Sequence, residues 1–159
     1  MMLTVLPLPD WYRPWLVELL RREWGSPRMD TCGRMYNAAE LPALLALLEE
    51  SPAGVITYRM AGDECEIVAL HSVIVGRGAA SALLDALREA AQDAGCHRLW
   101  LITTNDNTDA LEFYQKRGFH LKALYPNAIE ESRKLKPEIP QTGRNGIPIR
   151  DEMELEMNW

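Results

Sequence analysis

The sequence predicts a mixed α/β fold in a single domain, and two observations lead to this class. Short runs rich in β-branched residues alternate with stretches whose apolar residues recur at helical spacing. The length of 159 residues is typical of one domain, and such a domain buries about 70% of the surface that its unfolded chain exposes. We therefore expect one domain over residues 1–159.

Composition and charge exclude several classes of function. The apolar fraction is 47% and the charged fraction is 25%, which are ordinary values for a globular protein. The formal net charge of -6 argues against nucleic acid as a partner and favours a cationic or amine-bearing one. No segment approaches the run of about 18 apolar residues that a membrane span requires, so no membrane attachment is expected.

The cysteines and the N-terminal residues favour a cytoplasmic location. Cys32, Cys65 and Cys96 are odd in number and far apart, so neither a disulfide framework nor a Cys-x-x-Cys metal or redox pair is expected. The opening residues, MMLTVLPLPDWYR, lack the basic segment and sustained apolar run of a secretory signal. We expect a reduced, cytoplasmic protein without a metal site.

The first elements are a strand and a helix. Residues 2–7 predict a strand that ends at Pro7. Asp10 is placed to cap the next helix and Gly25 to end it. Four large apolar residues of this helix have core-facing spacing: Trp11, Trp15, Leu19 and Leu20. The polar, glycine-containing residues 26–38 predict a loop with a short extended piece.

The next elements are interpreted as a three-strand meander at about 43–49, 54–60 and 64–72. The last two runs, GVITYRM and CEIVALHSV, are rich in β-branched residues, with AGDE between them. The first run, ALLALLE, has helical propensity, so a helix over 39–50 is the alternative. Propensity is a weak prior that tertiary context overrides, and the neighbouring strands favour the meander.

The pattern changes period after Val75 and predicts a helix over 80–94, ended by Gly95. Its apolar face consists of Ala80, Leu83, Leu84, Leu87, Ala91 and Ala94. The apolar run 98–104 predicts a strand, and NDNTDALEFYQKRG predicts a short helix that Gly118 ends. A further strand, FHLKALY, follows.

The C-terminal part contains an irregular excursion and a last strand. Residues 126–148 hold four prolines and two glycines, and they predict a helical turn followed by a surface loop. A connection of this length in a compact domain is usually functional or disordered. Residues 149–157 alternate strictly, which predicts a strand with apolar residues on one face and solvent-facing glutamates on the other.

The stretch VIVGRGAASALLDAL, Val73 to Leu87, joins a strand to a helix through two glycines. Gly76, Gly78 and Ala80 allow a close approach to the backbone, and the exposed N–H groups of a helix N-terminus favour an anion such as a pyrophosphate. A plain connecting turn is the simpler alternative. A Rossmann fold with Asp106 on a ribose is a second one, but it requires more parallel units than the remaining chain can supply.

A second motif, N-x-x-A-x-x-x-Y-x-x-x-G-F, follows the strand after that helix. It consists of Asn107, Ala110, Tyr114, Gly118 and Phe119. In this order and separation, the two motifs resemble the acyl-CoA signature of the GNAT superfamily of N-acetyltransferases. The resemblance is strong over residues 64–119 and looser before and after.

The resemblance implies a mixed, mostly antiparallel sheet of six or seven strands flanked by helices. The sheet would be split between the strand ending near Ser72 and the strand 98–104, with the pantetheine arm of acetyl-CoA in the split. The backbone of Leu70, His71 and Ser72 would pair with the pantetheine amides. Asn107 would bond the same arm, cap its helix, or do both.

The resemblance also assigns the pyrophosphate to the glycine loop. The residues implied are Val75, Gly76, Arg77, Gly78, Ala79, Ala80 and Ser81. Val75 departs from the superfamily pattern, which has Gln or Arg at this position, so Arg77 is expected to supply part of the missing charge.

Transfer to an amine needs a proton acceptor and a proton donor. Tyr114 lies at the tyrosine position of the family and is the expected donor to the departing sulfur, although it could instead be a packing residue. Glu66 is the expected base, with a solvated edge-strand carboxylate as the alternative. His71 is the next candidate, followed by Asp151 and Glu152. An oxyanion donor is expected from backbone N–H groups near His71 or Ser72.

The resemblance predicts an enzyme that moves an acetyl group from acetyl-CoA to an amine-bearing acceptor by direct attack on the thioester. A non-catalytic acyl-CoA-binding sensor or partner domain is the alternative. The excursion 126–148 is expected to border the acceptor site. Its cations Arg133, Lys134 and Lys136 would bind a substrate carboxylate or the ribose phosphate, or form a solvated loop. The acceptor is left open, and a homodimer is the default oligomeric state.

Overall fold

The computed structural model describes residues 2–31 and 34–159, so Cys32 lies outside the described residues. The main sheet has seven strands in the order β1-β4-β5-β6-β7-β9-β8. The strands are β1 (Leu3–Pro7), β4 (Ala43–Leu48), β5 (Ser51–Ala61), β6 (Glu64–Ser72), β7 (Arg98–Thr104), β8 (His120–Tyr125) and β9 (Glu152–Asn158). Neighbouring strands are antiparallel except β6 and β7, which are parallel.

This topology confirms a mixed, mostly antiparallel sheet of seven strands. The Rossmann alternative is wrong, because that fold needs a mostly parallel sheet and only one parallel pair is present among the described strands.

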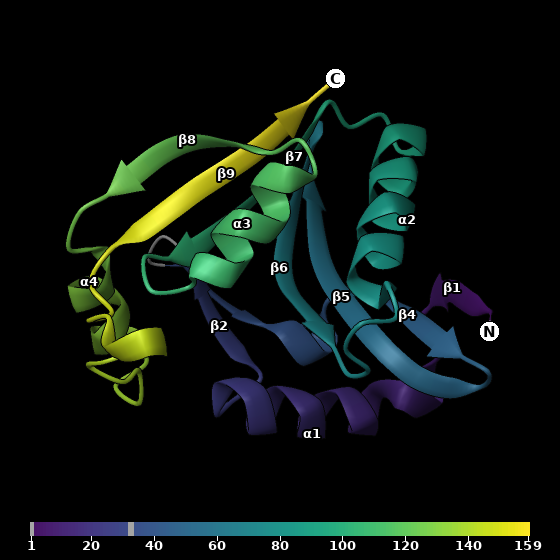
Figure 1. Cartoon of the computed structure of the whole chain (residues 1–159), viewed down its shortest axis with the longest axis horizontal. Helices are drawn as coiled ribbons and strands as arrows, with labels where there is room; N and C mark the ends of the chain where they lie inside the picture. Colours follow the sequence, from purple (N-terminus) through teal and green to yellow (C-terminus); the bar gives the residue numbers. More distant parts are fainter. Residues whose placement is uncertain (1, 32–33) are drawn as a thin grey trace.

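Helices cover both faces of the sheet (Figure 1). The helices are α1 (Arg13–Trp24), α2 (Ala79–Asp93), α3 (Thr108–Lys116) and α4 (Ala128–Leu135). One core cluster packs α2 and α3 against the sheet, and a second packs α1 against the opposite face. None of the described helices is both long enough and apolar enough to cross a bilayer.

The meander over β4, β5 and β6 is confirmed. In β4 the residues alternate between the two core clusters: Leu44 packs on the α2 side, while Ala43 and Leu45 pack on the α1 side. A strand buried on both faces reads as a continuous apolar run, which explains why ALLALL resembles a helix locally.

Three expectations near the N-terminus are wrong. Asp10 caps no helix with its side chain; it opens a 3-10 turn (Asp10–Tyr12), and α1 starts at Arg13. Trp11 is 80% exposed because it lies in this turn and not on the buried face of α1. Residues expected to be mainly a loop form a hairpin of β2 (Arg28–Thr31) and β3 (Arg34–Asn37).

The expectation that the glutamates of the last strand face solvent is also wrong. β9 begins at Glu152, and its Glu152, Glu154 and Glu156 are buried. Arg98 on the neighbouring β7 donates to Glu156 at 2.6 Å and also pairs with Glu154. The alternation is therefore real, but an arginine across the strand pair compensates for the burial of the carboxylates.

Candidate active site

The sheet splits between β6 and β7. Their parallel pairing joins Glu64–Ile67 to Arg98–Leu101, and no pair beyond these is formed in the described part of the chain. β6 continues to Ser72 with β5 as its partner. Over this stretch, the backbone N–H and C=O groups of β6 that point toward β7 have no strand partner. They are therefore available to the amides of an extended ligand.

A β-bulge lies at the start of the split. Thr57 of β5 pairs with Ala69 and Tyr58 pairs with Ile67, so Val68 is an extra residue on β6. A bulge bends its strand and increases the local twist. Because Val68 directly follows the last residue paired with β7, we attribute the divergence of the two strands to this bulge.

The glycine loop leads from the split to the N-terminus of α2. Gly76 and Gly78 have φ angles of 81° and 77°, values that side chains rarely adopt. Gly78 is the N-cap residue, and no side chain caps the helix, so the first-turn N–H groups of Ala79, Ala80 and Ser81 have no capping side chain. This exposed helix start fits an anionic group such as a pyrophosphate.

Arg117, which sequence reasoning missed, also lies at this helix start. Its guanidinium donates two hydrogen bonds to Ser81 Oγ, at 3.0 and 2.7 Å, and its Cζ lies 3.7 Å from the centre of the Phe113 ring. Arg77, the expected source of charge, lines a small separate cavity with Leu3 and Leu48. Arg117 therefore places a cation beside the first turn of α2.

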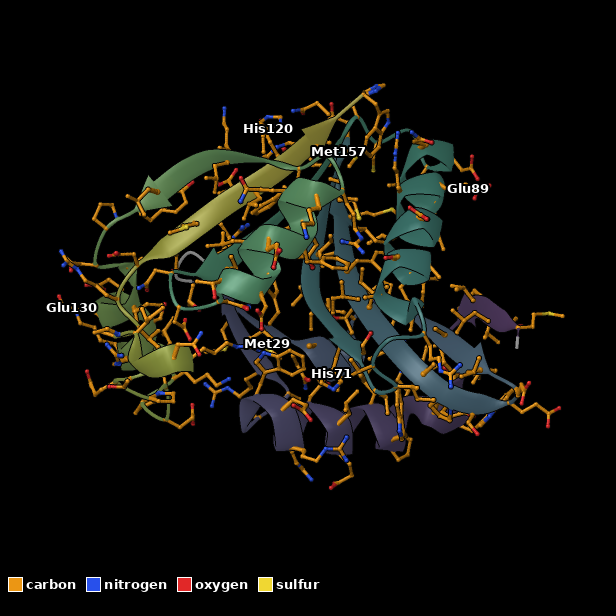
Figure 2. The ribbon with its side chains drawn as sticks, in the orientation of Figure 1. Met29, His71, Glu89, His120, Glu130 and Met157 are labelled. Atoms are coloured by element: carbon orange, nitrogen blue, oxygen red, sulfur yellow. The ribbon has the colours of Figure 1, made fainter. Side chains whose placement is uncertain are left out.

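A large pocket opens on the α1 side of the split, with a volume of about 900 Å³. Val68 of β6 and Ile102 of β7 line it where the strands diverge. One side wall comes from the end of α1 and from β2, including Trp24 and Met29. In Figure 2, Met29 and His71 both lie on the side of the sheet that α1 covers.

The other wall of the pocket is the excursion 126–148, which begins with α4. Arg133 stabilises this excursion, because its guanidinium donates to the carbonyl oxygens of Pro140 at 2.8 Å and Ile149 at 2.9 Å. Lys136 is buried and its Nζ donates to the carbonyl oxygens of Trp24 and Arg28. Arg133 and Lys136 thus hold the wall together, and only Lys134 lies on an exposed surface, where it pairs with Glu131.

Asp106 anchors the same wall. Its carboxylate accepts from Thr104 Oγ1 at 2.5 Å and from the backbone N of Arg144 at 3.1 Å. A Cβ on Gly143 would lie 2.0 Å from Asp106 Oδ2, so only glycine allows this approach. The idea of Asp106 as a ribose ligand is therefore wrong, because this carboxylate is occupied by the chain itself.

Tyr114 lies on α3 in the core cluster on the other face of the sheet. Its ring packs edge-on against Phe113 and Phe119, at centroid distances of 5.1 and 5.2 Å. Burial raises its pKa above the ordinary value, so the phenol is protonated at neutral pH. This is the protonation state that a donor requires, and the role itself stays a prediction.

The two candidate bases on β6 lie on the α1 face. Glu66 is 1% exposed, so the alternative of a solvated edge-strand carboxylate is wrong. The Arg34 Nη2 atom lies 3.9 Å from Glu66 Oε1. Glu66 precedes the split and does not line the pocket, whereas Glu152 does. His71 lies 3.7 Å from Glu23 Oε1, and burial lowers its pKa more than Glu23 raises it.

Asn107 caps α3 and also lines the pocket. Its Oδ1 accepts from the backbone N of Ala110 at 3.3 Å, and its Nδ2 donates to Thr103 Oγ1 at 3.2 Å.

Among the residues that the structure describes, no group of three or more His, Cys, Asp or Glu side chains could hold a metal ion. Cys65 and Cys96 are free, buried thiols.

The sequence and the fold both have counterparts among known proteins. The model of the acetyltransferase (GNAT) family matches residues 6–119. The chain belongs to the GNAT family of acetyltransferases. Among curated proteins, this GNAT chain is 42% identical to the uncharacterized protein YdhI of Bacillus subtilis (strain 168) over 153 residues, 96% of each chain.

Solved GNAT structures share the fold. An IAA acetyltransferase from Bacillus cereus ATCC 14579 superposes with a TM-score of 0.74 and 21% identity, over 99% of this chain and 100% of that one. An acetyltransferase from Bacillus subtilis in complex with CoA gives a TM-score of 0.70 and 18% identity, over 99% of both chains. At this level of identity the likeness establishes the GNAT fold alone.

Proposed function

We propose that this protein is an acetyl-CoA-dependent N-acetyltransferase that transfers the acetyl group to a primary amine by direct attack on the thioester. One observation carries the proposal: the split in the sheet connects a helix start without a side-chain cap at one end with a large pocket on the α1 side. An extended donor and a separate acceptor can therefore meet at the split.

The residues present fit acetyl-CoA. The free backbone edge formed by Leu70, His71 and Ser72 suits the pantetheine amides, and Asn107 is close enough to the pocket to bond the same arm. The loop 75–81 offers positive-φ glycines and uncapped N–H groups to the pyrophosphate. Arg117 adds the cation that Val75 lacks. When bound, acetyl-CoA supplies the activated acyl group.

The protein must then move two protons. An acceptor amine with a pKa of about 10 is mostly protonated at neutral pH and must lose a proton before it attacks. We retain Glu66 as the proposed base and name Glu152 as its competitor, because Glu152 lines the pocket. Tyr114 is the proposed donor to the sulfur, supported by its buried, protonated phenol.

Two measurements test the proposal. Acetyl-CoA at about 100 times its dissociation constant should stabilise the fold by roughly 2.7 kcal/mol, which a thermal melt detects. Release of the free thiol in the presence of an amine panel then measures transfer. Absence of a thermal shift at millimolar acetyl-CoA would refute the donor assignment. Binding without thiol release for any amine would favour a non-catalytic acyl-CoA-binding domain.

A further inference from the structure

The pocket on the α1 side of the split has the size of a small-molecule site. Its volume of about 900 Å³ lies within the range of roughly 300–1,000 Å³ that is typical for such ligands. Apolar side chains form much of its surface, among them Trp24, Met29 and Ile139. An acceptor with an alkyl body can therefore bury most of its surface there.

The two side walls of this pocket are tied to each other. Lys136 belongs to the excursion wall, and its Nζ donates to Trp24 O at 3.1 Å and to Arg28 O at 3.0 Å in the opposite wall. Arg28 Nη2 also lies 3.4 Å from the carbonyl oxygen of Leu135. A polypeptide acceptor rises about 3.3 Å per residue and needs a trough that is open along its length. This crosslink joins the two walls at the end of α1 and leaves less room between them for an extended chain.

The charge of the pocket is predominantly negative. Its lining contains four carboxylates, Glu23, Asp106, Glu138 and Glu152, against two cations, Lys136 and Arg144. Both cations have partners within the protein, because Lys136 bonds the two carbonyl groups and Arg144 lies 3.3 Å from Asp109. Two of the carboxylates also have partners, since Arg22 Nε lies 3.3 Å from Glu23 Oε1 and Asp106 accepts from Thr104. The lining still holds more carboxylates than cations.

The carboxylates differ in position. Glu152 is buried, 3% exposed, on β9, where it pairs with Thr104 at the end of β7. Glu23 at the end of α1 and Glu138 in the excursion belong to the two side walls and reach solvent. Asp106 is engaged with Thr104 and Arg144. An acceptor that reacts at the split would thus place its far end near the carboxylates of the walls.

We infer that the acceptor is a small aliphatic amine that carries a second positive charge, such as a diamine or polyamine, and not the N-terminus of a protein. This inference rests on the proposed function. One amine is held at the split, the alkyl chain packs on the apolar lining, and the distal ammonium pairs with Glu23 and Glu138. The tied walls limit the size of the acceptor, and the carboxylates set its charge.

Matched acceptors test the inference. Diaminobutane and pentylamine have the same length and differ only in a distal ammonium or methyl group, and a pentapeptide with a free N-terminus represents protein acceptors. With saturating acetyl-CoA, kcat/KM for diaminobutane should exceed that for pentylamine by about tenfold to a hundredfold, as expected for hydrogen bonds between charged groups. The peptide should show no transfer above background.

Variants of the wall carboxylates identify the site. Glu23→Gln combined with Glu138→Gln should reduce the ratio of diaminobutane to pentylamine efficiency to about one. Glu89→Gln, on the exposed outer surface of α2 (Figure 2), should keep the wild-type ratio. With CoA present, diaminobutane should raise the melting temperature of the wild type and not of the double variant.

The outcomes separate the two proposals. Equal efficiency with pentylamine, or efficient acetylation of the peptide, would overturn the inferred acceptor class and leave the N-acetyltransferase function intact. Binding of acetyl-CoA without transfer to any acceptor of a broad panel would overturn both.

Discussion

Replacement of Arg117 by glutamine tests the phosphate site at the start of α2. The Arg117 guanidinium lies 2.7 Å from Ser81 Oγ, in the first turn whose N–H groups would bind a phosphate. Two unit charges about 4 Å apart attract by about 1 kcal/mol in water and by about 4 kcal/mol at an effective dielectric constant near 20. Because Arg117 is exposed, we expect the smaller end of this range, about 1 to 2 kcal/mol.

This loss corresponds to an increase in the Kd for CoA of about 5- to 30-fold, measured by titration calorimetry. Pantetheine, which lacks the phosphates and the adenosine of CoA, is the control ligand, and its Kd should not change. Arg117→Lys retains the charge and should recover much of the affinity, although it loses the stacking on Phe113. The effect should diminish as salt rises. An unchanged Kd for CoA in a folded Arg117→Gln protein would refute the assignment.

Three further predictions concern catalysis and the pocket wall. Tyr114→Phe should retain the fold and the affinity for acetyl-CoA. The rate of transfer should fall by about 100- to 10,000-fold where bond cleavage limits turnover. Full activity in single-turnover assays would make Tyr114 a packing residue. Glu66→Gln should lose activity near neutral pH and regain it as the pH approaches about 10, because the amine then loses its proton unaided. If only Glu152→Gln shows this pH–rate profile, the base is Glu152. Lys136→Met should lower the free energy of unfolding in urea by about 1 to 3 kcal/mol and raise activity toward bulkier acceptors, whereas Lys134→Met, on the exposed side of α4, should do neither. An unchanged acceptor range would show that the tie between the walls does not limit acceptor size.

Much of the candidate donor site could be predicted because its signals are local. Gly76 and Gly78 are adjacent in sequence to the helix that they open, and their positive φ angles follow from residue type. The spacing of Asn107, Tyr114 and Gly118 lies within one helix and its ends. Local spacing could not reveal Arg117, because its partner Ser81 is 36 residues away and only the packing of α3 beside α2 brings them together.

The sequence by itself determined the class of fold, the meander, the main helices and the glycine loop, because periodicity and turn chemistry act over a few residues. The tertiary structure alone decided three other features. The bulge at Val68 depends on register with β5, the burial of Glu154 and Glu156 depends on Arg98 of a neighbouring strand, and the tie between the pocket walls depends on Lys136 reaching the end of α1. Each is a contact between residues distant in the chain, and long-range pairing of this kind leaves no periodic signal in the sequence.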